Sequence, residues 1–293
     1  MDLRCDFHVH STVSDGTLAP GEIASLAHET GVDTLALTDH DEIAGVAEAA
    51  RRGSELGVEV IAGIEFSVTE DEGRRQMHIL GLGIDPDFPA LRECVAALRS
   101  ARVRRSVEIL ERLREVGIHI SRERLAEIAG EGSIGRPHVA RALVEAGVCA
   151  SMDEAFGRFL RRGRPAFIAH PGLPSERAIS LIHAAGGIAS LAHPPSSLGV
   201  QEPGGLELFV ERLVATGLDG LEVWHPSQHP GQTRKLGKLA RKWDLVPTGG
   251  SDFHGADRPD VKLGRGRGRL RLGRSERDRI LDRIAQVRVP GGV

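Results

Sequence analysis

Short runs of apolar residues recur along the chain, and a turn and a helical pattern follow most of them. These runs lie at residues 3–9, 33–38, 58–64, 77–83, 186–192, 218–224 and 244–250. Each is typical of a buried strand in a parallel sheet. Between them lie amphipathic stretches such as residues 20–31, where Pro20 near the start and Gly31 at the end predict a helix. Strand–helix alternation over this length predicts an α/β barrel or a doubly wound sheet.

The alternation stops between residues 96 and 168. There the chain reads as consecutive helices, each ending at a glycine, with no convincing strand among them. We therefore predict a helical insertion domain at 96–168 within an α/β domain formed by 1–95 and 169–293. Near the end of the chain, Gly264–Arg274 alternates arginine with glycine or leucine, and this pattern could equally form a final strand with a basic face.

Composition narrows the class of protein. Of the 293 residues, 40% are hydrophobic, enough to bury a sizeable core. With eight Phe, two Trp and no Tyr, a surface that stacks many bases on aromatic rings is hard to build. The three cysteines lie far apart, which argues against a thiolate zinc site and suits a reducing compartment. With no apolar signal segment or membrane span evident, we expect a cytoplasmic enzyme with no obligate protein partner.

Charge is distributed unevenly along the chain. The net charge of −3 divides into +5 for residues 96–168, +7 for residues 262–293 and −15 for the remainder. An acidic body with basic flanks suits metal cations held by carboxylates, with arginines nearby to attract an anionic substrate.

Histidines and carboxylates gather where the predicted strands end. His8 and His10 close the first strand, and their spacing places both imidazoles on one face. Further residues of these types follow later strands, namely Asp39, His40, Glu65, His193, Asp252 and His254. His78 is an exception, because it lies at the start of its predicted strand. In a parallel barrel, the carboxyl ends of the strands are where active sites are built.

The chemistry of this set points to divalent metals. Imidazole and carboxylate ligands without thiolate favour Mn²⁺, Zn²⁺ or Fe²⁺ over Ca²⁺ or an iron–sulfur cluster. A carboxylate such as Glu65 can bridge two metals, which together neutralise charge on a reacting phosphoryl group. We find no Walker loop, no Rossmann glycine fingerprint in the right context and no Gly-x-Ser-x-Gly elbow.

Six motifs give this pattern a family resemblance. In order, they are DFHVHSTVSDGTLAP, LALTDHD, GIEFSV, HILGLGID, LAHP and GSDFHG. Together they resemble the signature of the PHP (polymerase and histidinol phosphatase) family. The resemblance implies a distorted (β/α)₇ TIM-like barrel that holds up to three divalent metals, with Mn²⁺ favoured over Zn²⁺ or Fe²⁺.

The resemblance also implies a set of ligands for each metal. The first metal would be held by His8, His10, Glu65 and Asp252; the second by Glu65, His78 and His193; and the third by Asp15, His40 and His254. Among these, Glu65, Asp15 and His193 are the residues that we expect to carry catalysis. Asp39 is better placed to orient a histidine than to bind metal.

The insertion, with its RPHVARAL helix start, resembles a subgroup of 3′,5′-nucleotide bisphosphate phosphatases whose members also trim short RNA from its 5′ end. Arg136 would begin its helix there, where a guanidinium can bind phosphate near a helix N-terminus. The other expected substrate-binding residues are His138, Arg164, His170 and His225. The implied substrate is a nucleotide such as adenosine 3′,5′-bisphosphate (pAp), or short 5′-phosphorylated RNA.

Alternatives remain open at this stage. A phosphatase of a small metabolite such as histidinol phosphate would leave the basic insertion without a role. A non-catalytic metal-binding PHP module would be expected to lack several ligands, and here every ligand position holds a metal-competent residue. His170, in IAHPG, mimics the His193 motif, although the run before His193 is the better buried strand.

Overall fold

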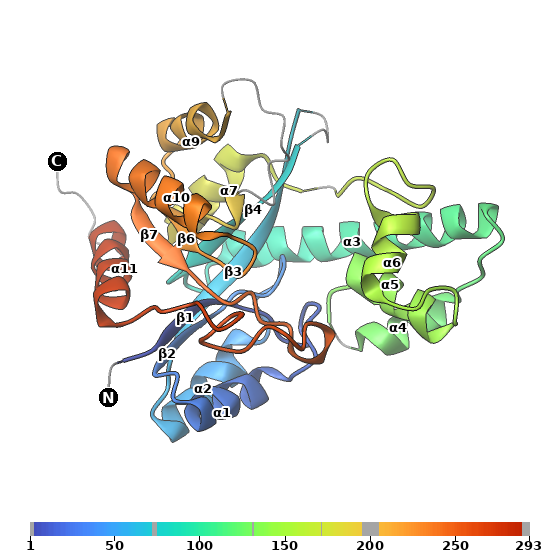
Figure 1. The fold of residues 1–293 in the computed structure, drawn as a ribbon, viewed down its shortest axis with the longest axis horizontal. Coiled ribbons are helices and arrows are strands. Elements are labelled where there is room, and N and C mark those ends of the chain that lie inside the picture. Colours follow the sequence, from blue (N-terminus) through green and yellow to red (C-terminus); the bar gives the residue numbers. More distant parts are fainter. Residues whose placement is uncertain (1–2, 72–74, 131, 171, 195–204, 289–293) are drawn as a thin grey trace.

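Seven strands form one curled sheet at the centre of the protein (Figure 1). The computed structural model describes residues 3–288 except 72–74, 131, 171 and 195–204. In chain order the strands are β1 (Cys5–Val9), β2 (Thr34–Leu37), β3 (Glu59–Glu70), β4 (Arg75–Leu82), β5 (Ile188–Leu191), β6 (Gly220–Trp224) and β7 (Val246–Gly249). A parallel bridge between Val9 and Phe253 brings the two edges together, so the sheet is a nearly closed seven-stranded barrel. The predicted α/β barrel is confirmed.

One strand runs against the predicted direction. β4 pairs antiparallel with both β3 and β5, whereas all the other neighbouring strands are parallel. The expectation of a wholly parallel sheet is therefore wrong at β4. Because β4 runs in reverse, its first half lies at the same mouth of the barrel as the carboxyl ends of the other strands. His78 pairs with Ser67 of β3 and so lies at this mouth, although it is near the start of the predicted strand.

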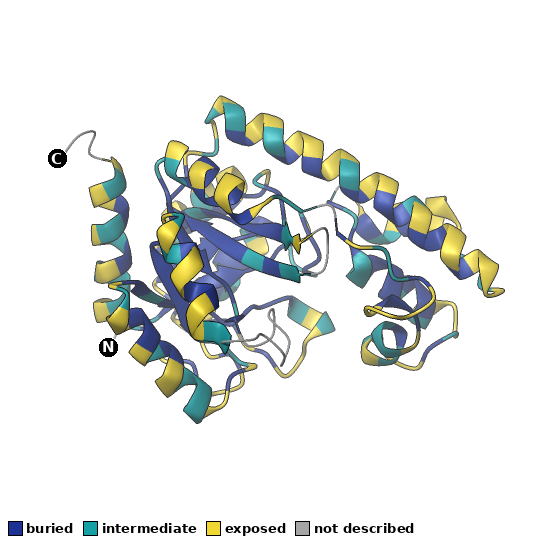
Figure 2. Ribbon diagram, turned by 90° about the horizontal axis from the view of Figure 1, so that it is seen from above, coloured by how far each residue is buried: buried dark blue, intermediate teal, exposed yellow. Residues whose placement is uncertain are grey.

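Helices cover the outside of the barrel (Figure 2). They are α1 (Pro20–Thr30), α2 (Val46–Leu56), α7 (Ser175–Ala184), α9 (Gly205–Ala215), α10 (Pro230–Lys242) and α11 (Arg274–Arg288). α1 begins at Pro20 and ends before Gly31, whose φ of 69° is easily adopted only by glycine. The strands are largely buried, while the helices turn an exposed face outward, as the alternating sequence pattern predicts.

The insertion is helical in its described part. α3 (Pro89–Glu115) is continuous from the barrel into the insertion, and α4 (Arg122–Ala129), α5 (Arg136–Glu145), α6 (Met152–Ala155) and a π-helical turn (Phe156–Leu160) follow. A hydrophobic cluster of its own runs from Ile109 to Ala166. Because α3 begins before residue 96, the insertion is joined to the barrel by a rigid helix rather than by a flexible linker. The domain limits 1–95, 96–168 and 169–293 stay a prediction.

The basic stretch Gly264–Arg274 forms turns rather than the strand that its alternation allowed. Gly264, Gly266 and Gly268 have φ values of 68°, 52° and 83°, and these left-handed conformations break extended structure. The segment crosses from the barrel mouth back to α11. Within the described residues, none of the helices combines the length and apolar character needed to cross a membrane.

Candidate metal centre

Nine histidine and carboxylate side chains converge at the mouth of the barrel. β1 and the loop after it supply His8, His10 and Asp15, and β3 and β4 supply Glu65 and His78. His40 follows β2, His193 follows β5, and Asp252 and His254 follow β7. All nine belong to overlapping groups whose potential ligand atoms lie close together. They are the nine residues predicted from the sequence, brought together from six strands.

Glu65 lies between two of these groups. Its Oε2 is 2.9 Å from His40 Nδ1, 3.2 Å from His10 Nε2 and 3.3 Å from His8 Nε2. Its Oε1 is 2.8 Å from His78 Nδ1 and 3.0 Å from His193 Nε2. Because its two oxygens face different sets of histidines, this carboxylate is placed to bridge two cations.

Asp252 completes the first group, with Oδ1 3.3 Å from His10 Nε2 and 3.6 Å from His8 Nε2. A third group surrounds Asp15, whose Oδ1 is 3.4 Å from His254 Nε2 and whose Oδ2 is 3.8 Å from His40 Nε2. Bonds of about 2.0–2.2 Å to a common ion separate neighbouring ligand atoms by roughly 3–3.5 Å. The observed spacings lie at or slightly above this range, so these groups are placed to hold divalent ions.

Several of these atoms are buried and yet make no hydrogen bond within the described residues. They are His8 Nε2, His10 Nε2, Asp15 Oδ1, His40 Nδ1, Glu65 Oε2 and His254 Nε2. Buried polar atoms without partners are rare, because each costs about 1–3 kcal/mol. Bound cations would satisfy all six, so the donor set fits divalent metal ions.

The carboxylates are held in their charged form. Burial alone would raise the pKa of Glu65, but His40, His78 and His8 hold it well below its usual range. For Asp252, burial acts in the same direction and is outweighed by Arg258 and His254, so its pKa is also far below normal. The centre therefore offers the negative charge that metal binding requires.

The backbone is strained at this mouth. Asp41, His193 and Asp252 have φ values of 53°, 29° and 52°. Residues other than glycine rarely adopt this backbone conformation. Gly250 is also required, because a Cβ at this position would lie 2.2 Å from His8 Cβ. Such strain is typical of sites whose geometry the surrounding fold imposes.

A buried glutamate that the sequence analysis did not single out supports two of the histidines. Glu222 of β6 is fully buried, and its Oε1 accepts a hydrogen bond from His8 Nδ1 at 3.0 Å. Its Oε2 accepts from the backbone N–H of His193 at 2.6 Å. The sequence feature that could have identified Glu222 is its charge inside the apolar run at 218–224, because a strand of the barrel interior normally carries no charged residue.

Asp39 acts through serines rather than directly on a histidine ring. It accepts hydrogen bonds from Ser11 Oγ at 2.6 Å and Ser14 Oγ at 2.5 Å, and Ser14 Oγ in turn lies 3.5 Å from His10 Nδ1. The orienting role expected of Asp39 is therefore indirect and directed at the loop after β1.

We expect Glu222→Gln to weaken metal binding about tenfold, since the loss of such supporting partners typically costs 10–100-fold. Glutamine keeps the size of the side chain but replaces one acceptor oxygen with an N–H₂ group. This group would then face one of the two donors, His8 Nδ1 or the His193 backbone N–H. Metal titration of the stripped protein would measure the change, with Glu207→Gln on exposed α9 as the control. Equal affinities in the two variants would contradict a supporting role for Glu222.

The predicted substrate residues lie in different surroundings. His170 is 8% exposed, with Nε2 3.5 Å from Asp41 Oδ2. Burial, followed by the charge of Arg102, lowers the pKa of His170 to about 2 and keeps it neutral. His138 is buried and its Nδ1 accepts from the Gly135 N–H at 2.9 Å, which caps α5. Arg164 is exposed, with no described contact to these residues. Substrate roles for these residues stay predictions.

Arg136 begins α5 beside two arginines that the sequence analysis missed, Arg102 and Arg105 of α3. Arg102 is 6% exposed and pairs with Asp41 at 2.6 Å. Arg105 is 5% exposed and donates to the Ile168 carbonyl. Burial, then the charges of Arg136 and Arg102, lowers the pKa of Arg105 to about 9. The sequence feature that could have identified Arg102 and Arg105 is their three-residue spacing, which places both on one face of α3. We call Arg102, Arg105 and Arg136 the arginine cluster.

The arginine cluster adjoins the metal centre. Asp41 directly follows His40, and Arg102 Nη2 also donates to Ser67 Oγ at 3.1 Å, opposite His78 in the sheet. At the other side of the centre, His225 Nε2 lies 3.3 Å from Asp252 Oδ2. The metal centre is therefore flanked by buried arginines on one side and by His225 on the other.

Comparison with known proteins agrees with this geometry. The PHP domain profile matches residues 6–132. A 5′-3′ exoribonuclease of Haemophilus influenzae is 39% identical over 258 residues, which cover 87% of this chain and 91% of that protein. A 3′,5′-nucleoside bisphosphate phosphatase of Chromobacterium violaceum is 38% identical, with 85% of this chain and 86% of that protein covered.

A crystal structure shares the whole architecture. A putative metal-dependent phosphoesterase from Bifidobacterium adolescentis superposes with a TM-score of 0.85 at 31% identity, and 96% of each chain is covered. Shared sequence over nearly full length, a shared barrel and a matching domain profile give one conclusion: this chain belongs to the PHP family.

Proposed function

We propose that this protein, a metal-dependent phosphoester hydrolase, cleaves the 3′-phosphoester bond of nucleotides that also carry a 5′-phosphate. Its substrates would be nucleoside 3′,5′-bisphosphates such as pAp and short 5′-phosphorylated RNA. The names of the two relatives described above support both substrates. The observation that carries the proposal is the arginine cluster beside the metal centre.

The arginine cluster holds more positive than negative charge. Asp41 neutralises Arg102, but neither Arg105 nor Arg136 makes an ion pair within the described residues. Arg105 is buried and Arg136 is partly buried. A buried charge without a counter-charge is costly, so such groups are retained where an anion binds. Ser133, three residues before the first residue of α5, has a buried hydroxyl without a hydrogen-bond partner among the described residues. A 5′-phosphate would satisfy these groups at once.

The same bond would be broken in both substrates. In pAp, water attacks the 3′-phosphorus and the P–O3′ bond breaks, which gives AMP and phosphate. In 5′-phosphorylated RNA the same attack releases the first nucleotide as a 5′-monophosphate with a free 3′-hydroxyl. The phosphate stays on the 5′-oxygen of the remaining RNA. The product therefore carries a new 5′-phosphate and is again a substrate.

The residues divide this work between them. His8, His10, Glu65 and Asp252 would hold one metal ion, Glu65, His78 and His193 a second, and Asp15, His40 and His254 a third, with Mn²⁺ proposed for all three. Divalent ions at these positions supply Lewis acidity and charge neutralisation at the scissile phosphate. Arg136, with Arg102 and Arg105, would bind the phosphate that is not cleaved. His225 borders the opposite side, where the RNA that remains after cleavage would lie.

Parallel assays of one preparation would test the proposal. The purified protein, loaded with Mn²⁺, Zn²⁺ or Fe²⁺, would be offered pAp, a 5′-phosphorylated trinucleotide RNA, histidinol phosphate and p-nitrophenyl phosphate. We expect the highest kcat/KM on pAp and the trinucleotide, and loss of activity after chelation. A preference for histidinol phosphate would overturn the proposal, and absence of turnover on all four would favour a non-catalytic module.

A further inference from the structure

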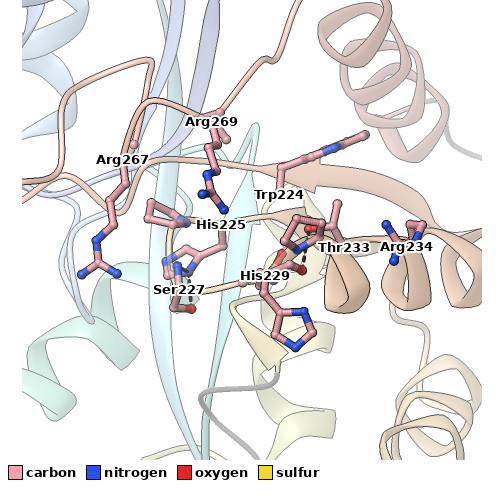
Figure 3. A pocket seen from close by; sticks show the side chains of 13 residues that line it. Trp224, His225, Ser227, His229, Thr233, Arg234, Arg267 and Arg269 are labelled. Atoms are coloured by element: carbon pink, nitrogen blue, oxygen red, sulfur yellow. Dashed lines mark hydrogen bonds between the residues drawn. The ribbon is translucent and has the colours of Figure 1, made fainter.

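A second basic surface borders the metal centre on the side away from the arginine cluster. A cavity of about 690 Å³ lies between the start of α10 and the segment from Gly266 to Leu270 (Figure 3). His225, Ser227 and His229 line it from the connection between β6 and α10, and Arg267 and Arg269 reach it from the other wall. We call this cavity the arginine groove.

The arginine groove opens onto the predicted metal ligands. His225, which lines it, has a side chain only 7% exposed, and its Nε2 lies 3.3 Å from Asp252 Oδ2. The ring of His225 is 6.1 Å from that of His8 and 5.2 Å from that of His193. Its Nε2 makes no hydrogen bond within the described residues. One end of the groove is therefore in contact with the metal centre.

The described residues that line the groove include three arginines, Arg234, Arg267 and Arg269, and no acidic residue. All three arginines are exposed. Arg267 pairs with Asp260 at 2.7 Å, but both side chains are more than half exposed, and such pairs contribute little. Their guanidinium groups are thus available to an anion that enters from solvent.

From this arrangement we propose that the arginine groove binds the phosphates of the RNA chain beyond the scissile bond. The inference rests on the proposed function. If the 5′-phosphate lies in the arginine cluster and the first 3′-phosphate lies at the metals, the following nucleotides must leave on another side. The arginine cluster adjoins Asp41 and His170, whereas the groove adjoins Asp252, His8 and His193. The polarity of the bound RNA then matches removal of nucleotides from the 5′ end.

The groove would distinguish the two substrates. pAp ends at the scissile phosphate, so it cannot reach the groove, whereas RNA of three or more nucleotides places further phosphates there. Backbone contacts of this kind are independent of base sequence and weaken with salt, by a log–log slope of about −0.7 per phosphate on a single strand. The groove thus supplies affinity for RNA without selecting a sequence.

The test compares substrates of increasing length in one double variant, Arg267→Ala with Arg269→Ala. Initial rates with Mn²⁺ would be measured on pAp and on 5′-phosphorylated RNA of two, three and six nucleotides. We expect KM for the hexamer to rise about tenfold, KM for pAp to change less than twofold, and the penalty to grow with length. The salt dependence of kcat/KM on the hexamer should become shallower by about 1.4 in log–log slope, because two phosphate contacts are lost.

A matched control removes the same charge elsewhere. Arg241 on α10 and Arg279 on α11 are exposed and do not line the groove, so Arg241→Ala with Arg279→Ala should behave like the wild type on every substrate. Equal loss on pAp and hexamer would overturn the inference, because the arginines would then act on the metal centre. No loss on the hexamer, or the same loss in the control, would overturn it too. If the wild type hydrolyses neither pAp nor RNA, it is the proposed function that fails.

Discussion

Glu65→Gln is expected to lower kcat by more than a hundredfold on pAp and on RNA alike. The two oxygens of Glu65 face different sets of histidines, so the amide would remove a charge that two cations share and replace one oxygen ligand with a poor nitrogen donor. A hundredfold loss corresponds to about 2.7 kcal/mol of transition-state stabilisation. Steady-state kinetics and the metal content of the purified variant would measure the effect.

Glu59→Gln is the matched control, since Glu59 is the first residue of β3 and pairs with Arg277 at a partly exposed site. It should retain near-normal kcat. Circular dichroism and thermal unfolding should show both variants folded, because the barrel core does not depend on the Glu65 charge. If Glu65→Gln kept more than about a tenth of wild-type kcat, a loss under about 1.4 kcal/mol, the bridging role would be wrong.

Arg136→Ala is expected to reduce kcat/KM ten- to a hundredfold on pAp and on 5′-phosphorylated RNA. It removes a charge-assisted contact worth about 1.5–3 kcal/mol to the phosphate that is not cleaved. The penalty should nearly vanish on p-nitrophenyl phosphate, which has no second phosphate. Lysine at this position should restore only part of the activity, because an ammonium cannot supply the planar pair of donors.

Arg104→Ala serves as the control for this variant, since Arg104 is exposed on α3, close in sequence to Arg102 and Arg105. It should leave all three substrates unaffected. An equal loss on all three substrates for Arg136→Ala would mean that Arg136 acts on the reacting phosphoryl group or on folding. Wild-type kinetics on all three would remove the main support for a bisphosphate substrate.

Much of the metal centre could be predicted because its signals are local. His8 and His10 lie on one face of a strand wherever the strand is placed, and Glu65 and Asp252 follow apolar runs. Once an α/β barrel is inferred, the carboxyl ends of the parallel strands must meet at one mouth. The convergence of the nine predicted ligands could therefore be inferred without knowledge of tertiary contacts. That these residues bind metal stays a prediction.

The direction of β4 could not be predicted from its sequence. A short apolar run has the same alternation in both directions, and its pairing depends on the neighbouring strands and on the short β3–β4 connection. His78 therefore looked misplaced at the start of its strand. The antiparallel pairing with β3 and β5 brings it to within 2.8 Å of Glu65 Oε1.

By itself, the sequence determined an alternating α/β architecture, a helical insertion and the residue types at the mouth, since each follows from periodicity or from spacing within a few residues. The choice of a barrel over a doubly wound sheet came from the family resemblance. Only the tertiary structure decided which oxygen of Glu65 faces which histidines and that Glu222 holds His8. It also placed Arg102 and Arg105 beside Arg136, and Arg267 and Arg269 opposite His225. These contacts join segments far apart in the chain. Their free energy comes from burying and pairing charges in three dimensions, which no local pattern of polar and apolar residues records.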